Sequence, residues 1–370
     1  MTQRQYRLDF RKEDVTYILD RVNASTSCSL VGVGSIGKSN LIAHLLNPVV
    51  HIHYLGGDSA NMLKLINIDA NMLTLLTAGQ DDEAHRAWTG FELMMHRLFL
   101  AFYPFEALSA DDARSFFTTY QSLQDGRNPL YASMGLRYFE LGLAFFLRRG
   151  FKLVFLFDEF ETMLDRMPVK FFLALRGLRD VYKGQLSYIT FARSPLPVLI
   201  ERIGFDALSI EPFVELFNDH VRYIGPYSTQ DAADMVSVLV KRSSRPLSDS
   251  TVAALLDATG RFAGMIRAGW SILEMANNYT PTNAQDAAVF LGARKSIRLE
   301  CRTIWDGLNL SEQIVLRAVA RLESYNIDSA SEDAVSMLLQ KRLLRLDRAL
   351  NALIVEPPVL RYFIAHSADL

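Results

Sequence analysis

The sequence predicts an α/β fold in which a parallel sheet is sandwiched by helices, and three observations carry this prediction. A glycine-rich loop joins a short apolar run to a helical segment. A second, longer apolar run ends in two adjacent carboxylates. Strand-like and helical patterns then alternate through the first two-thirds of the 370 residues. Such alternation is typical of a parallel sheet covered on both faces.

The glycine-rich loop reads G-x-x-x-x-G-K-S, which is a complete phosphate-binding motif between a predicted strand at 28–31 and a predicted helix at 40–46. Its glycines let backbone N–H groups point at phosphate oxygens, and the following helix adds its positive end. Lys38 is expected to reach the β- and γ-phosphates, and Ser39 to hold Mg²⁺. The residues predicted to bind the nucleotide here are Gly32, Val33, Gly34, Ser35, Ile36, Gly37, Lys38, Ser39 and Asn40.

The second apolar run covers residues 152–157 and ends in Asp158 and Glu159. It is continuously apolar, as expected for a buried parallel strand, and ligands of such sheets bind where the strands end. Asp158 is expected to complete the Mg²⁺ shell with Ser39. Glu159 is placed to orient or deprotonate the water that attacks the γ-phosphate.

Two further strands are predicted at 64–69 and 187–191. Between them, Phe and Met recur at helical spacing, which favours a hydrophobic core over a cofactor site. The strand at 187–191 leads to Arg193, whose fork of donors matches phosphate oxygens. Spacing alone leaves two readings of Arg193 open: a sensor of the γ-phosphate, or a solvated charge.

Composition limits the classes of function. The net charge is −2, so any nucleic-acid binding must be local. The two cysteines lie far apart, which argues against a disulfide framework and favours a reducing cytoplasm. The polar start does not read as a signal peptide, and no apolar run approaches the roughly 20 residues that span a bilayer, so membrane anchoring is not expected. His51 and His53, on one face of an expected extended segment, lack a third ligand for a metal.

These motifs together resemble the STAND-type and archaeal-type P-loop ATPases, which are related to AAA+ proteins and to origin-recognition-type initiators. The similarity covers residues 8–290. Besides the loop and the acidic run, it rests on Phe10, Arg11 and Glu13, on the segment 190–194, and on the segment 225–228 followed by Ala232.

The resemblance implies roles for several residues. Arg11 lies in the segment that contacts the nucleotide, Arg193 stands at the sensor 1 position, and Pro226 begins a helical lid against adenine. Arg267 is the first choice for the phosphate-facing residue of sensor 2, and Arg261 the second. An arginine finger in an assembled ring would come from Arg176 or Arg179. No guanine-recognition motif Asn-Lys-x-Asp occurs, so ATP is preferred over GTP.

The pattern changes near residue 304 to short helices at 312–322 and 331–339, followed by strands at 341–346 and 353–355 and a last helix around Tyr362. This order resembles a winged-helix domain. A basic cluster favours duplex DNA as its ligand, whereas Glu332 and Asp333 in the recognition position oppose it. The cluster consists of Lys341, Arg342, Arg345 and Arg348.

We therefore expect an ATPase core at 1–225 with a helical insertion at about 70–150, a helical lid at 226–292 and a winged helix at 293–370. The expected function is that of a slowly hydrolysing ATPase with ATP and Mg²⁺ as cofactors, acting in the cytoplasm as a nucleotide-dependent conformational or assembly switch. Self-association and a protein partner are expected for such a switch. The alternative is a DNA-engaging ATPase, such as an initiator, a loader or a transposition-type helper.

Overall fold

The protein, seen here in a computed structural model, forms two compact units. The described residues are 6–73, 82–106, 108–124, 134–276 and 279–367. The first unit comprises Met1–Leu30 and Ser39–Arg222, and the second comprises Val31–Lys38 and Tyr223–Leu370. Parts of the expected insertion, at 74–81, 107 and 125–133, lie outside the described residues. The phosphate loop thus groups with the C-terminal residues rather than with the strand and helix that flank it.

A five-stranded parallel sheet organises the first unit, with the spatial order β2-β3-β4-β1-β5. β2 and β3 pair in register from Leu63↔Lys152 to Asp69↔Asp158, and β4 pairs with β3 in the same direction. Parallel strands end at one edge of the sheet, so the loop after β1 and the carboxylates after β3 leave from the same edge. The strands are β1 Cys28–Val31, β2 Leu63–Asp69, β3 Lys152–Asp158, β4 Leu186–Ala192 and β5 Val221–Tyr223.

The predicted α/β fold class is confirmed, and four of the strands lie within a residue or so of their predicted positions. β1 and β4 are buried along their whole length, and the interior of β3 is buried too, which explains why these strands carry no charged residue in their interiors. β5 was not predicted, because it has three residues and begins at the exposed Val221. It joins β1 through the Ser29 amide, which donates to the carbonyl of His220 at 2.8 Å.

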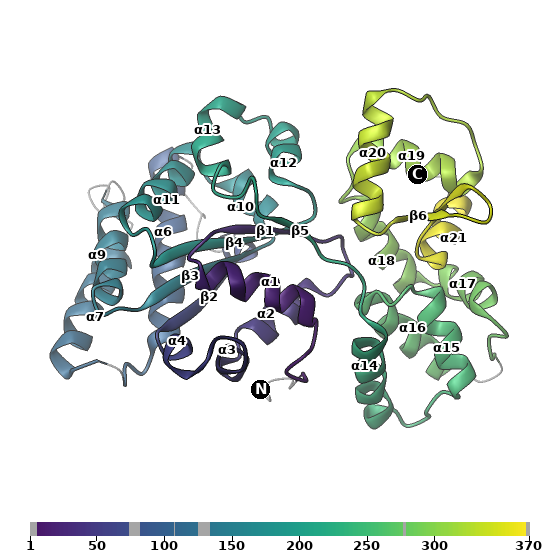
Figure 1. The fold of residues 1–370 in the computed structure, drawn as a ribbon, viewed down its shortest axis with the longest axis horizontal. Helices are drawn as coiled ribbons and strands as arrows, with labels where there is room; N and C mark the ends of the chain where they lie inside the picture. Colours follow the sequence, from purple (N-terminus) through teal and green to yellow (C-terminus); the bar gives the residue numbers. More distant parts are fainter. Residues whose placement is uncertain (1–5, 74–81, 107, 125–133, 277–278, 368–370) are drawn as a thin grey trace. The chain divides into compact units, whose positions relative to one another are not determined.

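Helices cover both faces of this sheet. Figure 1 shows α1 to α4 on one side of the strands and α10 to α13 on the other. The helices of this unit are α1 Lys12–Asn23, α2 Lys38–Leu45, α3 Pro48–Leu55, α4 Gly57–Asn61, the short 3₁₀ helix η1 Ala70–Met72, α6 Glu83–Phe102, α7 Ala110–Gln124, α9 Gly135–Leu147, α10 Phe160–Arg166, α11 Val169–Val181, α12 Leu196–Ile203 and α13 Ala207–Val214.

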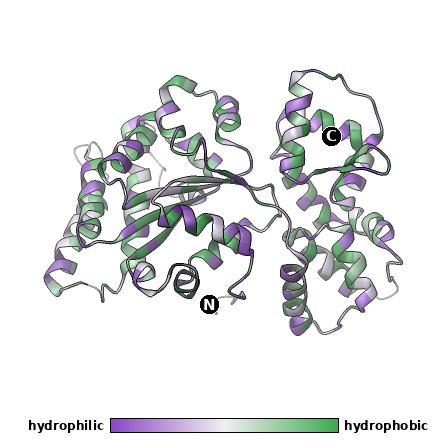
Figure 2. Cartoon of the chain, in the orientation of Figure 1, coloured by the Kyte–Doolittle hydropathy of each residue, from purple (hydrophilic) through white to green (hydrophobic). Residues whose placement is uncertain are grey.

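The aromatic residues at helical spacing form a core, as predicted. Phe155 and Phe157 of β3 are fully buried, and Phe155 meets Phe139 of α9 at 5.9 Å between ring centroids. Figure 2 shows hydrophobic and hydrophilic residues on different sides of the helices. One local prediction is wrong: His51 and His53 lie on α3, which Asn47 caps and Pro48 begins, and not on an extended segment.

The second unit is helical apart from one antiparallel hairpin. α19, α20 and the β6–β7 hairpin follow in the order expected for a winged helix. Its elements are α14 Thr229–Arg242, α15 Asp249–Ala258, α16 Ala263–Met275, α17 Ala284–Gly292, α18 Lys295–Trp305, α19 Leu310–Arg321, α20 Ser329–Gln340, β6 Leu344–Asp347, β7 Ala352–Val355 and α21 Pro358–His366. α20 begins earlier than predicted, because Asp328 caps it in a box with Ser331.

None of the described helices is both long and apolar enough to cross a membrane.

Candidate nucleotide site

The phosphate loop curls sharply between β1 and α2. Gly37 has φ 98° and Ser35 has φ 64°, so both have left-handed backbones. Glycine adopts this conformation without strain, whereas a serine needs neighbours that hold it there. Ile36 is fully buried, while Asn40 is half-buried just after the loop. The loop therefore has a defined shape, with Ser35 as its strained position.

Lys38 lies over its own loop. Its Nζ donates to the carbonyl of Gly32 at 2.6 Å and lies 3.5 Å from the carbonyl oxygen of Val33. The side chain is only 7% exposed. A buried cation costs solvation energy unless polar groups surround it. The loop thus keeps the lysine charge at the position where the motif predicts phosphates.

The phosphate loop is held by two helices of the second unit. The Gly264 amide at the start of α16 donates to the Ser35 carbonyl at 2.9 Å, and the Ser35 hydroxyl donates to the Glu300 carboxylate of α18. Gly34 lies so close to α18 that an added Cβ would stand 2.7 Å from Thr303. These contacts explain how Ser35 keeps its left-handed backbone. They also place a carboxylate directly on a loop whose motif predicts phosphate binding.

The acidic end of β3 is oriented by the backbone. Asp158 Oδ1 accepts a hydrogen bond from the Glu159 amide at 3.0 Å. Glu159 has φ 50° and ψ 50° and stands at the start of α10. A non-glycine residue in this region is strained, and surrounding structure must hold it there. The turn thereby separates the two carboxylates, so that Asp158 ends the strand while Glu159 begins the next helix.

Arg193, which follows β4, bridges two glutamates. Its NH2 nitrogen donates to Glu159 Oε2 at 2.9 Å, and its Nε lies 3.2 Å from Glu161 Oε1. The exposed fractions of the three side chains are 30% for Arg193, 26% for Glu159 and 13% for Glu161. Arg193 is therefore not a simple solvated charge, because it is tied to the residue predicted to activate water.

Ser39 and Asp158 offer the oxygen ligands expected for Mg²⁺. Ser39 is exposed in the first turn of α2, and Asp158 is half-buried at the end of β3. Alcohol and carboxylate oxygens are hard donors that suit a hard cation, which usually keeps several waters and nucleotide oxygens as its other ligands. The two residues present thus fit the metal that the sequence predicts.

Arg11 has protein partners in the first unit. It starts α1 with φ 47° and forms a buried ion pair with Asp14 at 3.0 Å. Asp14 also pairs with Arg222 at 2.7 Å. This network anchors α1 next to the end of the sheet and gives Arg11 a structural role besides the predicted nucleotide contact.

The predicted lid residues lie in the second unit. Pro226 is half-buried just before α14, while Arg267 is exposed on α16. Arg261 has φ 63° and donates to the Thr229 hydroxyl at 3.0 Å. Pro226 and Arg261, together with Arg342, line a hollow of about 780 Å³ between α15 and the β6–β7 hairpin. Arg261 is therefore held by a hydrogen bond within the second unit, whereas the side chain of Arg267 is exposed.

The two candidate finger residues have partners on the first unit. Arg176 pairs with Asp180 at 2.8 Å and donates to the carbonyl of Pro212. Arg179 reaches the carbonyl of Ser25 at 3.3 Å. Both arginines therefore lie on a face of α11 that contacts other residues of the first unit.

The predicted basic cluster of the C-terminal domain is smaller than its sequence implies. Lys341 is fully buried in an ion pair with Glu312 at 2.6 Å. Arg345 is paired with Asp347 and Glu356. The prediction of a basic surface cluster is therefore wrong for Lys341, whereas Arg345 is exposed but paired, and Arg342 and Arg348 are the exposed members without a described ion pair.

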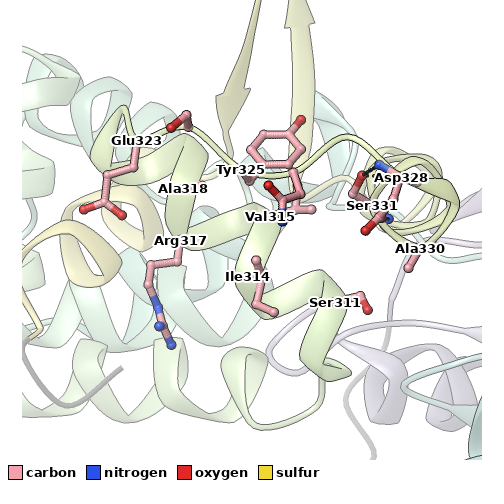
Figure 3. A pocket seen from close by; sticks show the side chains of 12 residues that line it. Ser311, Ile314, Val315, Arg317, Ala318, Glu323, Tyr325, Asp328, Ala330 and Ser331 are labelled. Carbon is pink, nitrogen blue, oxygen red and sulfur yellow. Dashed lines mark hydrogen bonds between the residues drawn. The ribbon is translucent and has the colours of Figure 1, made fainter.

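A hollow of about 440 Å³ lies between α19 and the start of α20. Figure 3 shows Ile314 of α19 and Tyr325 of the connecting turn beside Asp328 and Ser331, which hydrogen-bond each other. Ile327, in the same turn, is 83% exposed. The hollow is lined by apolar side chains, by Glu323 and Asp328, and by one basic residue, Arg317.

Both cysteines are buried free thiols, one in each unit. Burial raises the pKa of the Cys28 thiol to about 12, and burial also raises the pKa of Cys301. Since the thiolate is the reactive form, neither side chain is poised for chemistry.

The parallel sheet and the loop after its first strand give the chain a P-loop α/β fold, followed by a helical C-terminal region. No family model matches the sequence, and no curated protein matches it. Among solved structures, the Walker-type ATPase PABY2304 of Pyrococcus abyssi is similar, with a TM-score of 0.54 and 13% identity over 96% of this chain and 95% of that chain. The ORC2 protein of Aeropyrum pernix is similar with a TM-score of 0.46 and 12% identity over 99% and 94% of the two chains. At 13% identity, the likeness to the Pyrococcus abyssi protein concerns the fold alone.

Sequence reasoning missed three residues of this region. Glu300 and Thr303 lie on α18, far along the chain from the loop that they touch, and they belong to no motif. Glu161 follows the acidic pair but reads as a solvated charge of a helix. The sequence feature that could have indicated its role is its position two residues after Glu159, together with Arg193 just after the neighbouring strand.

Proposed function

We propose that the chain binds and slowly hydrolyses ATP and acts as a nucleotide-dependent conformational switch. The observation that carries this proposal is the attachment of the phosphate loop to α16 and α18. Gly264 and Glu300 hold Ser35 from these two helices. Any ligand that reshapes the loop must therefore change contacts made by the C-terminal helices.

ATP would reach the loop through its phosphates. Lys38 would release the carbonyls of its own loop and donate to the β- and γ-phosphates, and loop amides would donate to the remaining oxygens. The Glu300 carboxylate, held by Ser35, carries the same sign of charge as the phosphates. Repulsion between them would weaken the Ser35–Glu300 contact, so that binding of nucleotide loosens α18 from the loop.

Ser39 and Asp158 would hold Mg²⁺, which neutralises phosphate charge when bound with the nucleotide. Glu159 would orient the attacking water and accept its proton. In the structure Glu159 is paired with Arg193, and this pairing supports a slow rather than a fast turnover. Hydrolysis would then return the loop and α18 to their starting contact.

A DNA-engaging ATPase remains the second candidate, but the described surface favours a protein partner. α20 carries Glu332 and Asp333 and contains no Lys or Arg. Acids in this position repel phosphates, and the burial of Lys341 removes another expected DNA contact. The hollow beside α20, where Ile314 and Tyr325 lie with both Glu323 and Arg317, fits a segment of a protein better than it fits a duplex.

ATP binding tests the site most simply. Lys38→Ala should weaken ATP about 100-fold in titration calorimetry, because hydrogen bonds to charged groups are worth about 1.5–3 kcal/mol each. Lys183→Ala is the matched control, since Lys183 is an exposed lysine outside the phosphate loop. Equal affinity in Lys38→Ala and the wild type would contradict the proposed site.

Light scattering separates the switch from the DNA-engaging alternative. The wild type and Glu159→Gln are measured with ADP, with ATP, and with ATP plus duplex DNA. A change of size with ATP alone supports the switch, whereas a change that requires DNA supports the alternative.

A further inference from the structure

A hollow of about 670 Å³ lies between α12 and α13 on the surface of the first unit. Figure 1 shows these two helices next to each other. They are joined by a short turn, in which Gly204 ends α12 with φ 81°, a left-handed backbone that glycine adopts without strain. We define this hollow as the α12–α13 groove, and the residues that matter for its chemistry are Pro197, Glu201, Asp206, Leu208 and Glu211.

The α12–α13 groove exposes apolar side chains that the core does not use. Ile210 and Phe213 of α13 are fully buried, and Phe213 packs on Phe172 of α11 at 5.2 Å between ring centroids. Because a helix turns by about 100° per residue, Leu208 faces away from Ile210 and Phe213, and it is 77% exposed. Exposed Pro197 lines the same hollow from α12. Apolar side chains gathered in one surface hollow are typical of an interaction site.

The groove also carries three carboxylates. Glu201 follows Pro197 by four residues on α12, and Glu211 follows Leu208 by three residues on α13, so each acid shares a helix face with an apolar side chain. Asp206 precedes α13, but its side chain does not cap that helix. All three acids are exposed and have no described ion pair, and the described lining of the groove contains no Lys, Arg or His. The groove is therefore apolar with negative charge around it.

We propose that the α12–α13 groove binds a basic amphipathic segment of a partner protein. An apolar side chain of this segment enters the groove beside Leu208, as in the binding of an amphipathic helix to a hydrophobic groove. Its Lys or Arg side chains pair with Glu201, Asp206 and Glu211, which gives the interface its charge complementarity. The same carboxylates repel nucleic-acid phosphates. The groove involves no residue of the nucleotide site, so this proposal goes beyond the proposed ATPase function and does not depend on it.

Peptide selection tests the chemistry of the partner. A library of displayed random peptides is selected without nucleotide on the full chain and, in parallel, on Leu208→Ser. Peptides that require Leu208 should be basic and should carry apolar residues three or four positions apart. Leu208→Ser should keep the melting temperature of the wild type, since Leu208 is largely exposed. The proposal is overturned if no selected peptide requires Leu208, or if those that do are acidic or neutral.

The affinity of one selected peptide, measured by fluorescence anisotropy, tests the individual contacts. Leu208→Ser should weaken it about tenfold, because a leucine buried on binding is lost. Glu211→Lys should weaken it about fivefold, because attraction becomes repulsion. Val181→Ser and Glu106→Lys are the matched controls, since both residues are exposed and neither lines the groove, and they should stay within about twofold. Equal weakening by Glu106→Lys and Glu211→Lys would show nonspecific attraction and overturn the proposal.

A second copy of the chain is the rival occupant of the groove. Light scattering should give the same mass for the wild type and Leu208→Ser. A wild-type oligomer that dissociates in Leu208→Ser would assign the groove to self-association and overturn the proposal. The selected peptide should bind Lys38→Ala as tightly as the wild type. Loss of ATP binding therefore leaves this result intact, and a failure of the groove leaves the proposed ATPase function intact.

Discussion

The phosphate loop and the acidic strand end differ in the contacts that hold them. The loop is held from outside its own strand and helix, by Gly264 of α16 and Glu300 of α18. The acidic strand end is held from within the sheet unit, where Arg193 bridges Glu159 and Glu161. The difference shows that the phosphate loop depends on contacts with α16 and α18, whereas the acidic strand end depends on contacts within its own unit.

Removing the carboxylate of Glu159 should impair turnover, which depends on the acidic strand end, and should leave ATP binding at the phosphate loop nearly unchanged. Glu159→Gln should lower kcat roughly 10²–10⁴-fold, because the amide cannot accept the proton of the attacking water. ATP affinity should change little, since the predicted phosphate contacts come from Lys38 and the loop amides. Phosphate release and calorimetry check the two quantities. A variant that loses ATP binding together with turnover would contradict the separation of the two regions.

The buried ion pair between Lys341 and Glu312 allows the second unit to be weakened alone. Both side chains are 0% exposed. Lys341→Met should lower the stability of this unit by about 3–5 kcal/mol, because Glu312 is left as an unpaired buried charge. Arg345→Met is the matched control, since its ion pairs are exposed and should matter little.

The two thiols report on the two units separately. Cys28 belongs to the first unit and Cys301 to the second, and burial raises the pKa of both, so alkylation requires opening of the surrounding structure. In Lys341→Met, alkylation of Cys301 should accelerate while that of Cys28 stays at the wild-type rate. Equal acceleration at both sites would show that the units open together.

Neutralising Glu300 should change ATP binding at the phosphate loop and leave turnover, which depends on the acidic strand end, nearly unchanged. Glu300→Gln removes a carboxylate that ATP must displace, so affinity for ATP should rise about tenfold, which corresponds to about 1.4 kcal/mol. Turnover at saturating ATP should remain close to that of the wild type. Glu323→Gln, exposed in the turn after α19, is the control. Weaker ATP binding in Glu300→Gln would show that the carboxylate supports the loop instead of competing with phosphate.

The strands of the sheet could be predicted because each one is indicated by the composition of its own few residues. β1, β3 and β4 are buried on both faces, so their sequences are mostly apolar and lack charges in their interiors, and the phosphate-loop motif determines the turn and the helix after β1. β5 was not predicted, because it has only three residues and its first residue is exposed. The P-loop fold therefore follows from a few segments of the sequence.

The contacts that distinguish the site were less accessible to sequence reasoning. Glu300 meets Ser35 across 265 positions, and the close approach of Thr303 to Gly34 depends on packing. In the sequence, Lys341 has the pattern of a basic surface residue. In the structure it is buried in an ion pair with Glu312 of α19. Pairings between distant segments decide these roles, and a single sequence does not display them.

Amide hydrogen exchange of α18 tests the central claim most directly. It is measured without nucleotide, with ADP and with ATP, in the wild type and in Lys38→Ala. ATP should reduce the protection of α18 in the wild type, because phosphate displaces Glu300 from Ser35, and should leave Lys38→Ala unchanged. Tight ATP binding with unchanged protection of α18 would contradict the claim that the C-terminal helices read the state of the phosphate loop.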